Sequence, residues 1–430
     1  MSTPVVPPSL PPVTPPAAPL HRALAEPTER TSRLWVLWVV LASIGLWSGF
    51  FGPIQVLLAE QAAAVSPGHK AAVLSLVTGV GAAVSMASNP IWGAFSDRTT
   101  LRIGRRLPWV VGGAAGGAVA MLVLSVAHSI WLMVVGWSLA QAALNAMLAA
   151  ITAAVPDQVP TRERATVGGI VSIAQTAGVV VGSGIAAATG SIAAGYLTVA
   201  AVLVVTTLPY SLRSRDIPLP AELRPPFAWG EFWRSFWVSP RRYPDFGWAW
   251  ITRFLMNLGN AFLILYLLYY LTDEVGLSGD DAATGVFRLT AVYGAVTVVT
   301  AIAGGWWSDR VGRRKVFVIW SGLVTAAALL LFALVPTMSA AYAAAVVLGV
   351  GFGAYQAVDF AMITQVLPAA RDRGKDLGVI NIANAMPQVL APAFAAGVLA
   401  VGLGYRGLYI LAAAVSVLGS VLVVRIRSLA

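Results

Sequence analysis

The chain has 430 residues, of which 58% are hydrophobic and only 11% are charged. A soluble domain carries about 25% charged residues, so most of this chain cannot form a water-exposed surface. The chain has no cysteine, which excludes disulfides, thiolate metal sites and cysteine nucleophiles. The formal net charge is +10, but the basic residues lie in short clusters between long apolar runs. That pattern favours a membrane protein over a nucleic-acid-binding protein.

Residues 1–32 form a proline-rich arm before the first apolar run, which begins at Leu34. We expect this arm to be disordered, because it contains little that could form a core. It lacks the charged start, apolar run and cleavage site of a secretory signal.

Twelve long apolar segments follow the arm, and each is long enough to cross a membrane as a helix. A β-barrel would need short alternating segments instead. The sequence therefore predicts an all-α membrane protein with twelve transmembrane helices. The segments lie near residues 34–59, 71–95, 108–127, 130–155, 166–187, 190–211, 246–271, 283–307, 316–335, 340–366, 377–400 and 405–424.

The chain divides into two related halves. Residues 33–211 and 246–427 each hold six apolar segments, and the polar residues 212–245 link them. The segments 66–97 and 278–309 align without a gap at an offset of 212 residues. Parallel repeats of this kind predict two pseudo-symmetric six-helix bundles around a central site.

The distribution of Lys and Arg predicts the orientation of the chain. Of the 28 basic residues, 24 lie in the arm, in the loops on one side and at the C-terminus, whereas Lys70 and Arg406 lie in the opposite loops. We therefore expect both termini and the linker to be cytoplasmic, with the chain in the plasma membrane.

Two corresponding loops carry the same motif of Gly, Asp and Arg residues. A glycine allows close helix approach, an aspartate can cap a helix and pair with arginine, and arginines favour the anionic headgroup layer. The motif residues are Gly93, Asp97, Arg98, Gly104, Arg105 and Arg106 in the first half, and Gly305, Asp309, Arg310, Gly312, Arg313 and Arg314 in the second.

This pair of loops resembles the signature loop of the major facilitator superfamily, over about residues 33–427. The resemblance implies twelve helices that work by alternating access, with the two loops as a latch between the bundles. The alternative is that the loops act only as a topology signal.

The first loop is longer than usual, because residues 99–103 separate Asp97 and Arg98 from Gly104, Arg105 and Arg106. In this it resembles the corresponding loop of the glycoside–pentoside–hexuronide cation symporters and of the sucrose-type carriers. Helix 166–187 lacks the Gly-Pro pair that is usual in proton-driven drug exporters of the superfamily. Both features favour a sugar-like substrate over a drug.

Polar residues follow single faces of several helices that, by the resemblance, line the cavity. Amides and hydroxyls suit a polyhydroxylated ligand, although each could instead make an interhelical hydrogen bond. The candidate substrate-binding residues are Gln55, Gln141, Asn145, Asn257, Asn260, Tyr355, Gln356 and Asn384.

Asp359 and Arg253 are candidates for ion coupling, because ionised groups at membrane depth are costly and usually functional. Arg253 lies about 12 Å and Asp359 about 13 Å from the same membrane face, at 1.5 Å per helical residue. Asp359 is the only acidic residue that the sequence places within a span. A static buried ion pair is the alternative interpretation.

The sequence therefore predicts a secondary transporter that imports a sugar-like solute with a coupling ion, expected to be a proton. The alternative is proton-coupled efflux of a drug or natural product. Because no catalytic group or metal cluster stands out, we expect no enzyme activity, cofactor or metal. The expected partners are a small-molecule substrate, the coupling ion and the lipid bilayer, but no nucleic acid.

Overall fold

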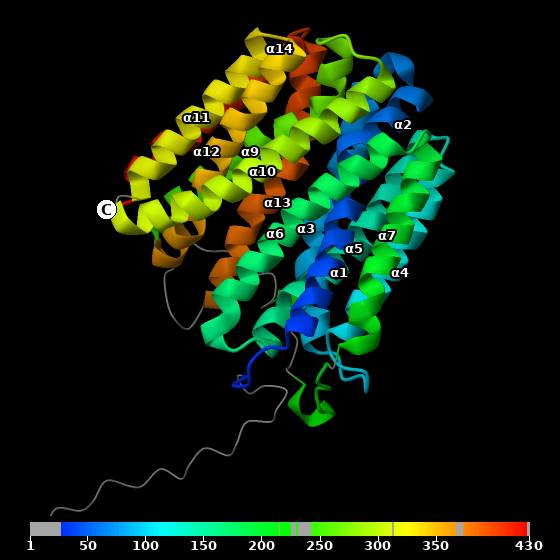
Figure 1. The fold of residues 1–430 in the computed structure, drawn as a ribbon, viewed down its shortest axis with the longest axis vertical. Helices are drawn as coiled ribbons and strands as arrows, with labels where there is room; N and C mark the ends of the chain where they lie inside the picture. Colours follow the sequence, from blue (N-terminus) through cyan, green and yellow to red (C-terminus); the bar gives the residue numbers. More distant parts are fainter. Residues whose placement is uncertain are drawn as a thin grey trace, which may run out of the picture.

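The computed structural model describes residues 27–214, 216–224, 229–230, 241, 243–311, 314–366 and 373–427. Within these ranges every regular element is a helix. Figure 1 shows the helices as two groups of long, roughly parallel rods that lean against each other.

The first group contains the helices of residues 33–213. Its first helix begins as α1, passes through a π-helical turn and continues as α2, so that one span covers Arg33–Val65. The elements are α1 (Arg33–Gly52), the π turn η1 (Pro53–Leu57), α2 (Leu58–Val65), η2 (Pro67–His69), α3 (Lys70–Asp97), α4 (Leu107–Ser125), α5 (Ile130–Gln158), α6 (Thr161–Ala188) and α7 (Ile192–Arg213).

The second group begins after the linker, in which the short 3₁₀ turn η3 (Ala221–Leu223) is described. Its elements are α9 (Pro244–Asp273), α10 (Gly279–Val311), α11 (Arg314–Leu334), α12 (Met338–Val366), α13 (Arg373–Ala400), α14 (Gly404–Leu422) and η4 (Val423–Arg425).

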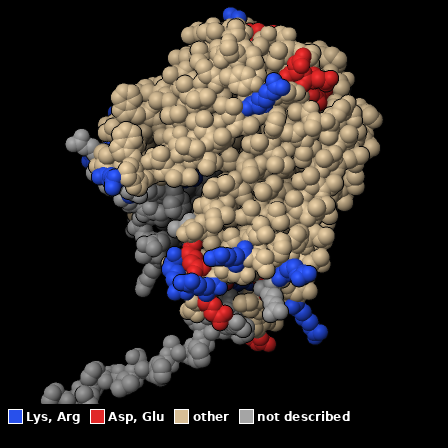
Figure 2. Space-filling model, viewed as in Figure 1, with Lys and Arg blue, Asp and Glu red and all other residues tan. Residues whose placement is uncertain are grey.

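Eleven helices of the described chain are long and apolar enough to cross a membrane, and α13 contributes a shorter apolar segment, Met386–Ala400. The expected all-α fold of two six-helix bundles is confirmed. Figure 2 shows a surface that is almost free of charged side chains between the two ends of the molecule, as contact with lipid requires.

One expectation about the first span is wrong. The sequence ended this helix near residue 59, but the structure extends it to Val65 and so places Glu60 within a spanning helix. Asp359 is therefore not the only acidic residue in a span. The helix continues because residues 58–65 are good helix formers and the next proline is Pro67, at the start of η2.

Glycine contacts bring helices of the first bundle together at backbone distance. A Cβ on Gly182 of α6 would lie 2.7 Å from the backbone nitrogen of Gly52 and 2.9 Å from the carbonyl oxygen of Ser48, both in α1. Only glycine fits such an approach. The two bundles meet most extensively along α3 with α13 and α6 with α10, and the π turn η1 also contacts α9 and α10.

The molecule has two ends, which we name by residues. The Lys70 end, at the top of Figure 1, contains α2, η2 and the start of α14. The Asp97 end, at the bottom, contains the loop between α3 and α4, and the described chain begins there.

Candidate functional site

A buried charged group lies between α9 and α12 in the second bundle. The Arg253 guanidinium nitrogen Nη1 is 3.0 Å from Asp359 Oδ2. The Tyr355 hydroxyl donates a hydrogen bond of 2.9 Å to the other carboxylate oxygen. Asp359 and Tyr355 are 6% and 2% exposed. The structure thus brings Arg253 and Asp359 into direct contact and adds Tyr355, one turn earlier on α12, as a second partner of the carboxylate.

Aromatic and aliphatic side chains surround this group. Tyr355 belongs to a buried cluster with Phe352, Met256 and Val358. Phe352 also lies 6.3 Å from Tyr293 of α10, whose hydroxyl donates to Asn260 Oδ1 at 3.5 Å. In such a setting, a charge is stable only with a close partner and hydrogen bonds.

The predicted amides of the first bundle form a network between α3 and α5. Asn145 Nδ2 donates to Ser85 Oγ and to the Gln141 carbonyl, both at 2.8 Å. Asn89 Nδ2 donates to Asn145 Oδ1 at 3.2 Å. Gln141 and Asn145 are buried, and part of their hydrogen-bonding capacity is used within the bundle.

Gln55 lies in the π turn of the first span. The turn forms at Pro53, and the N–H of Leu58 donates to the carbonyl of Pro53, five residues earlier. Gln55 is 3% exposed, and its Oε1 has no hydrogen-bond partner among the described atoms. π turns occur frequently at functional sites, and an unpaired buried acceptor is costly to retain.

Three further predicted binding residues lie in α9, α12 and α13. Asn257 Nδ2 donates to the carbonyl of Arg253, one turn earlier on α9. Gln356 is exposed on α12. The side chain of Asn384 lies outside the described part of the structure.

At the Lys70 end, polar contacts join the two bundles. Lys70 Nζ is 2.6 Å from Asp273 Oδ1. The buried Tyr269 hydroxyl of α9 donates to the carbonyl of Ala59 at 2.8 Å and approaches that of Lys70 at 3.3 Å. Tyr266, one turn earlier, shares a hydrogen bond of 2.5 Å with Ser75 of α3.

An aromatic cluster supports these contacts from within the second bundle. The ring of Tyr405 in α14 lies 6.2 Å from that of Tyr266 and 6.4 Å from that of Tyr269. The sequence analysis missed this set of tyrosines, because they lie in an apolar run with no motif around them. The ion pair and hydrogen bonds named here, which cross from bundle to bundle, all lie at this end.

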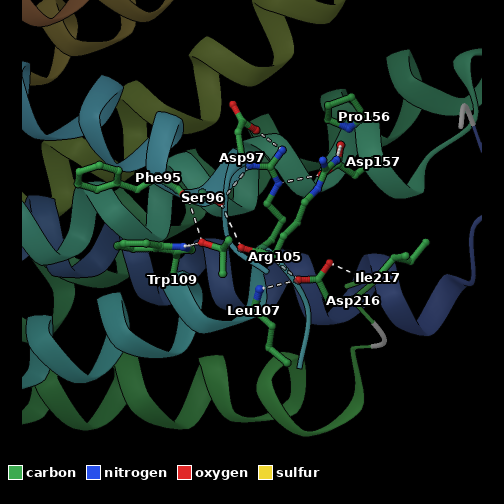
Figure 3. A network of polar contacts seen from close by, with 12 residues as sticks. Phe95, Ser96, Asp97, Arg105, Leu107, Trp109, Pro156, Asp157, Asp216 and Ile217 are labelled. Atoms are coloured by element: carbon green, nitrogen blue, oxygen red, sulfur yellow. Dashed lines mark hydrogen bonds and ion pairs between the residues drawn. The ribbon is translucent and has the colours of Figure 1, made fainter. Parts of the chain in front are cut away.

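At the Asp97 end, Figure 3 shows a polar network around Asp97 and Asp157 within the first bundle, and Arg106 pairs with both carboxylates. Its guanidinium is 2.6 Å from Asp97 Oδ1 and 2.8 Å from Asp157 Oδ2, and it donates to Ser96 Oγ. Arg105 also pairs with Asp157, at 2.6 Å. Burial by itself lowers the pKa of Arg106, but the two carboxylates raise it above its ordinary value. Asp157 is a partner that the motif alone does not reveal.

Asp216, from the segment after α7, caps the start of α4. Its Oδ2 accepts hydrogen bonds from the backbone N–H groups of Arg106, at 2.5 Å, and Leu107, at 2.8 Å. Gly104 has φ +116°, and a Cβ there would overlap Asp216. This explains why glycine is needed at that position. The cap ties the linker to the first bundle.

The remaining motif residues lie in or next to helices of both bundles. Arg98 lies directly after Asp97, and Gly93 has open space where a Cβ would lie. In the second loop, the Arg310 guanidinium lies 3.9 Å from the ring centroid of Trp306. Gly305 lies against Ala357, and Arg314 begins α11. The Asp309 side chain and the residues Gly312 and Arg313 lie outside the described part of the structure.

Comparison with known proteins places the chain among membrane transporters. A 33% identical relative, myo-inositol transporter 3C of Cryptococcus neoformans var. grubii, aligns over 176 residues, which are 38% of this chain and 29% of that protein. The chain thus spans less than a third of the length of this relative.

Solved structures match over almost the whole chain. A bacterial homologue of the human lysosomal transporter Spinster, inward-facing and unoccupied, has a TM-score of 0.64 at 15% identity, over 92% of this chain and 96% of that one. The nucleoside transporter NupG has a TM-score of 0.73 at 13% identity, over 92% and 99%.

The family comparison covers nearly all of the helical region. The model of the Major Facilitator Superfamily matches residues 37–287 and 249–429. The two six-helix bundles and the paired loop motifs agree with this match. The chain therefore belongs to the Major Facilitator Superfamily, a family of multi-pass membrane transporters.

Proposed function

We propose that this transporter imports a sugar-like polar solute by alternating access and that proton binding drives the import. The observation that carries the proposal is the group of Arg253, Asp359 and Tyr355. It places a carboxylate, a guanidinium and a hydroxyl between two helices of one bundle, away from both ends of the molecule.

The contacts at the Lys70 end support a conformation that is closed there. The bundles are joined by Lys70, Tyr266 and Tyr269, whereas Arg106 pairs with carboxylates of its own bundle at the Asp97 end. In the opposite conformation, Asp97 and Asp309 act as the latch between the bundles. The excess of basic residues at the Asp97 end supports its orientation toward the cytoplasm.

Asp359 is the proposed proton site, and Arg253 is its conformation-dependent partner. An isolated carboxylate in an apolar setting favours the neutral form, and a close guanidinium favours the charged form. Movement of α9 relative to α12 therefore changes the proton affinity of Asp359. This coupling of position to proton affinity is what a proton-driven transporter needs.

The chemistry of the candidate binding residues supports a polyhydroxylated substrate. Gln55, Gln141, Asn145 and Asn257 offer amide donors and acceptors on three helices, and Trp250 and Phe254 stack at 5.5 Å on α9. Such groups match hydroxyls and the apolar faces of a sugar ring. The likeness to the inositol transporter points to the same class of substrate.

The test compares Asp359→Asn with the wild type in proteoliposomes that hold a library of sugars and polyols. We expect the variant to exchange substrate at equilibrium but to lose accumulation under an imposed pH gradient. Glu274→Gln is the matched control, because Glu274 pairs at 3.1 Å with Arg406 at the Lys70 end, away from Asp359.

Undiminished gradient-driven accumulation by Asp359→Asn would exclude the coupling role. Loss of both exchange and folding would indicate a static ion pair, because removal of one partner leaves a buried charge at a cost of about 3–5 kcal/mol. Extrusion of a drug-like compound, with no sugar exchanged, would favour efflux.

A further inference from the structure

Two adjoining surface grooves lie at the Asp97 end, away from the interface between the bundles. The first, of about 300 Å³, is lined by Arg98, Trp109 and Arg224 among others. The second, of about 580 Å³, lies between Arg102 and the linker residues 217–221. Thr100 lines both, so the two adjoin, and we call them together the Arg98–Arg224 groove.

The cap by Asp216 builds this groove. Because the carboxylate holds the start of α4, the linker residues that follow it lie against the loop between α3 and α4. Leu219 anchors the linker further, since it is only 2% exposed. The groove is therefore a fixed feature of the fold and brings together arginines from two distant segments of the chain.

The charged side chains that line the groove are all cationic. They are Arg98, Arg102 and Arg224, and no carboxylate lines either part. The nearest motif carboxylate, Asp97, is paired with Arg106. Figure 2 shows Lys and Arg side chains gathered at this end of the molecule, with some Asp and Glu side chains beside them. The groove thus offers a positive site to an anionic ligand.

Apolar side chains surround the cationic groups. Trp109 forms one wall, stacked 6.3 Å from Phe95, and its indole N–H donates to Thr99 at 2.7 Å. Leu101 and Ile103 are 53% and 58% exposed in the same loop. Tryptophan and exposed aliphatic residues beside arginines, at the ends of spanning helices, are typical of contact with the headgroup layer.

We propose that the Arg98–Arg224 groove binds an anionic phospholipid, with the headgroup phosphate between Arg98 and Arg224. The glycerol backbone and upper acyl chains lie against Trp109 and Leu101. Guanidinium groups suit this role because they donate in pairs to phosphate oxygens. A free phosphate would use the arginines but would gain nothing from the apolar wall, so the groove as a whole fits a lipid.

The experiment is native mass spectrometry of the purified full chain, titrated with phosphatidylglycerol, phosphatidylcholine or inorganic phosphate. We expect one tight phosphatidylglycerol site in the wild type. Each arginine near an anionic lipid changes affinity about fivefold, so Arg98→Ala with Arg224→Ala should weaken that site about 25-fold. Arg162→Ala is the control, since Arg162 is an exposed arginine of α6 at the same end and lines neither groove.

Each result decides the proposal. Loss of the tight site in the double variant, with retention in Arg162→Ala, supports it. Equal weakening of phosphatidylglycerol binding in the double variant and in Arg162→Ala indicates general charge attraction and overturns the proposal. Phosphatidylcholine binding as tight as that of phosphatidylglycerol, or tight binding of inorganic phosphate, also overturns it. If the double variant does not fold, Arg224→Ala alone gives the same comparison, because Arg224 is exposed beside η3.

Discussion

The tyrosines of α9 allow the closure at the Lys70 end to be tested with an unusually well-matched pair of variants. Tyr269 and Tyr270 are adjacent and buried, and each donates its hydroxyl to a backbone carbonyl. Tyr269 reaches Ala59 of the other bundle at 2.8 Å, whereas Tyr270 reaches Phe332 of its own bundle at 2.7 Å. Only the first bond must break when the bundles separate at this end.

We expect Tyr269→Phe to favour the conformation that is open at the Lys70 end. A hydrogen bond of this kind contributes about 1 kcal/mol, so its loss should change the ratio of open to closed molecules about fivefold. Tyr270→Phe loses a similar bond that persists in both conformations. It should lower stability by a similar amount and leave the ratio unchanged.

Pulsed spin-label spectroscopy can measure this ratio, because the chain has no native cysteine. His69→Cys and Val401→Cys place labels at exposed positions of the two bundles at the Lys70 end. The long-distance population should grow in Tyr269→Phe only. Equal changes in both variants, or none in Tyr269→Phe, would refute the role of this tyrosine in closure.

Three further predictions concern single residues. Gln55→Met removes a buried acceptor without a partner. Thermal denaturation should therefore show stability unchanged or raised by up to about 2 kcal/mol, and substrate affinity should fall. Unchanged substrate affinity would show that Gln55 is not part of the binding site. Asp216→Ala deletes the cap of α4 and should cost about 1 kcal/mol, whereas Asp216→Asn should retain most of the stability; equal losses in melting experiments would argue against capping. Ala221→Cys should resist an impermeant thiol reagent in intact cells and react in inverted vesicles, and the reverse pattern would contradict the proposed orientation.

The sequence predicted the helices well, because each span is a run of about 20 consecutive, mostly apolar residues. It also related Arg253 to Asp359, since equal depth from one face is a matter of counting helical residues. The direct contact between Arg253 and Asp359 could be seen only in the structure, because the sequence does not give the distance between α9 and α12 within the bundle.

The closure at the Lys70 end could not be predicted in the same way. Tyr269 and Tyr270 differ by 100° around the helix axis, and both lie in an apolar run. Which of them faces the other bundle depends on the rotation of α9, which packing against α13 and α14 decides. The hydrogen-bond partner of Tyr269 is moreover the backbone carbonyl of Ala59. Every residue has such a carbonyl, so the sequence of α2 cannot indicate this contact.

The π turn at Pro53–Leu57 changes how the first span is to be compared with other helices. A π turn holds about one residue more than an α turn, and one residue corresponds to about 100° around the axis. A helical wheel drawn for residues 33–65 as a continuous α-helix therefore assigns the wrong face to Glu60 and Gln61. A structure-based alignment with a straight first helix requires a one-residue gap at this turn.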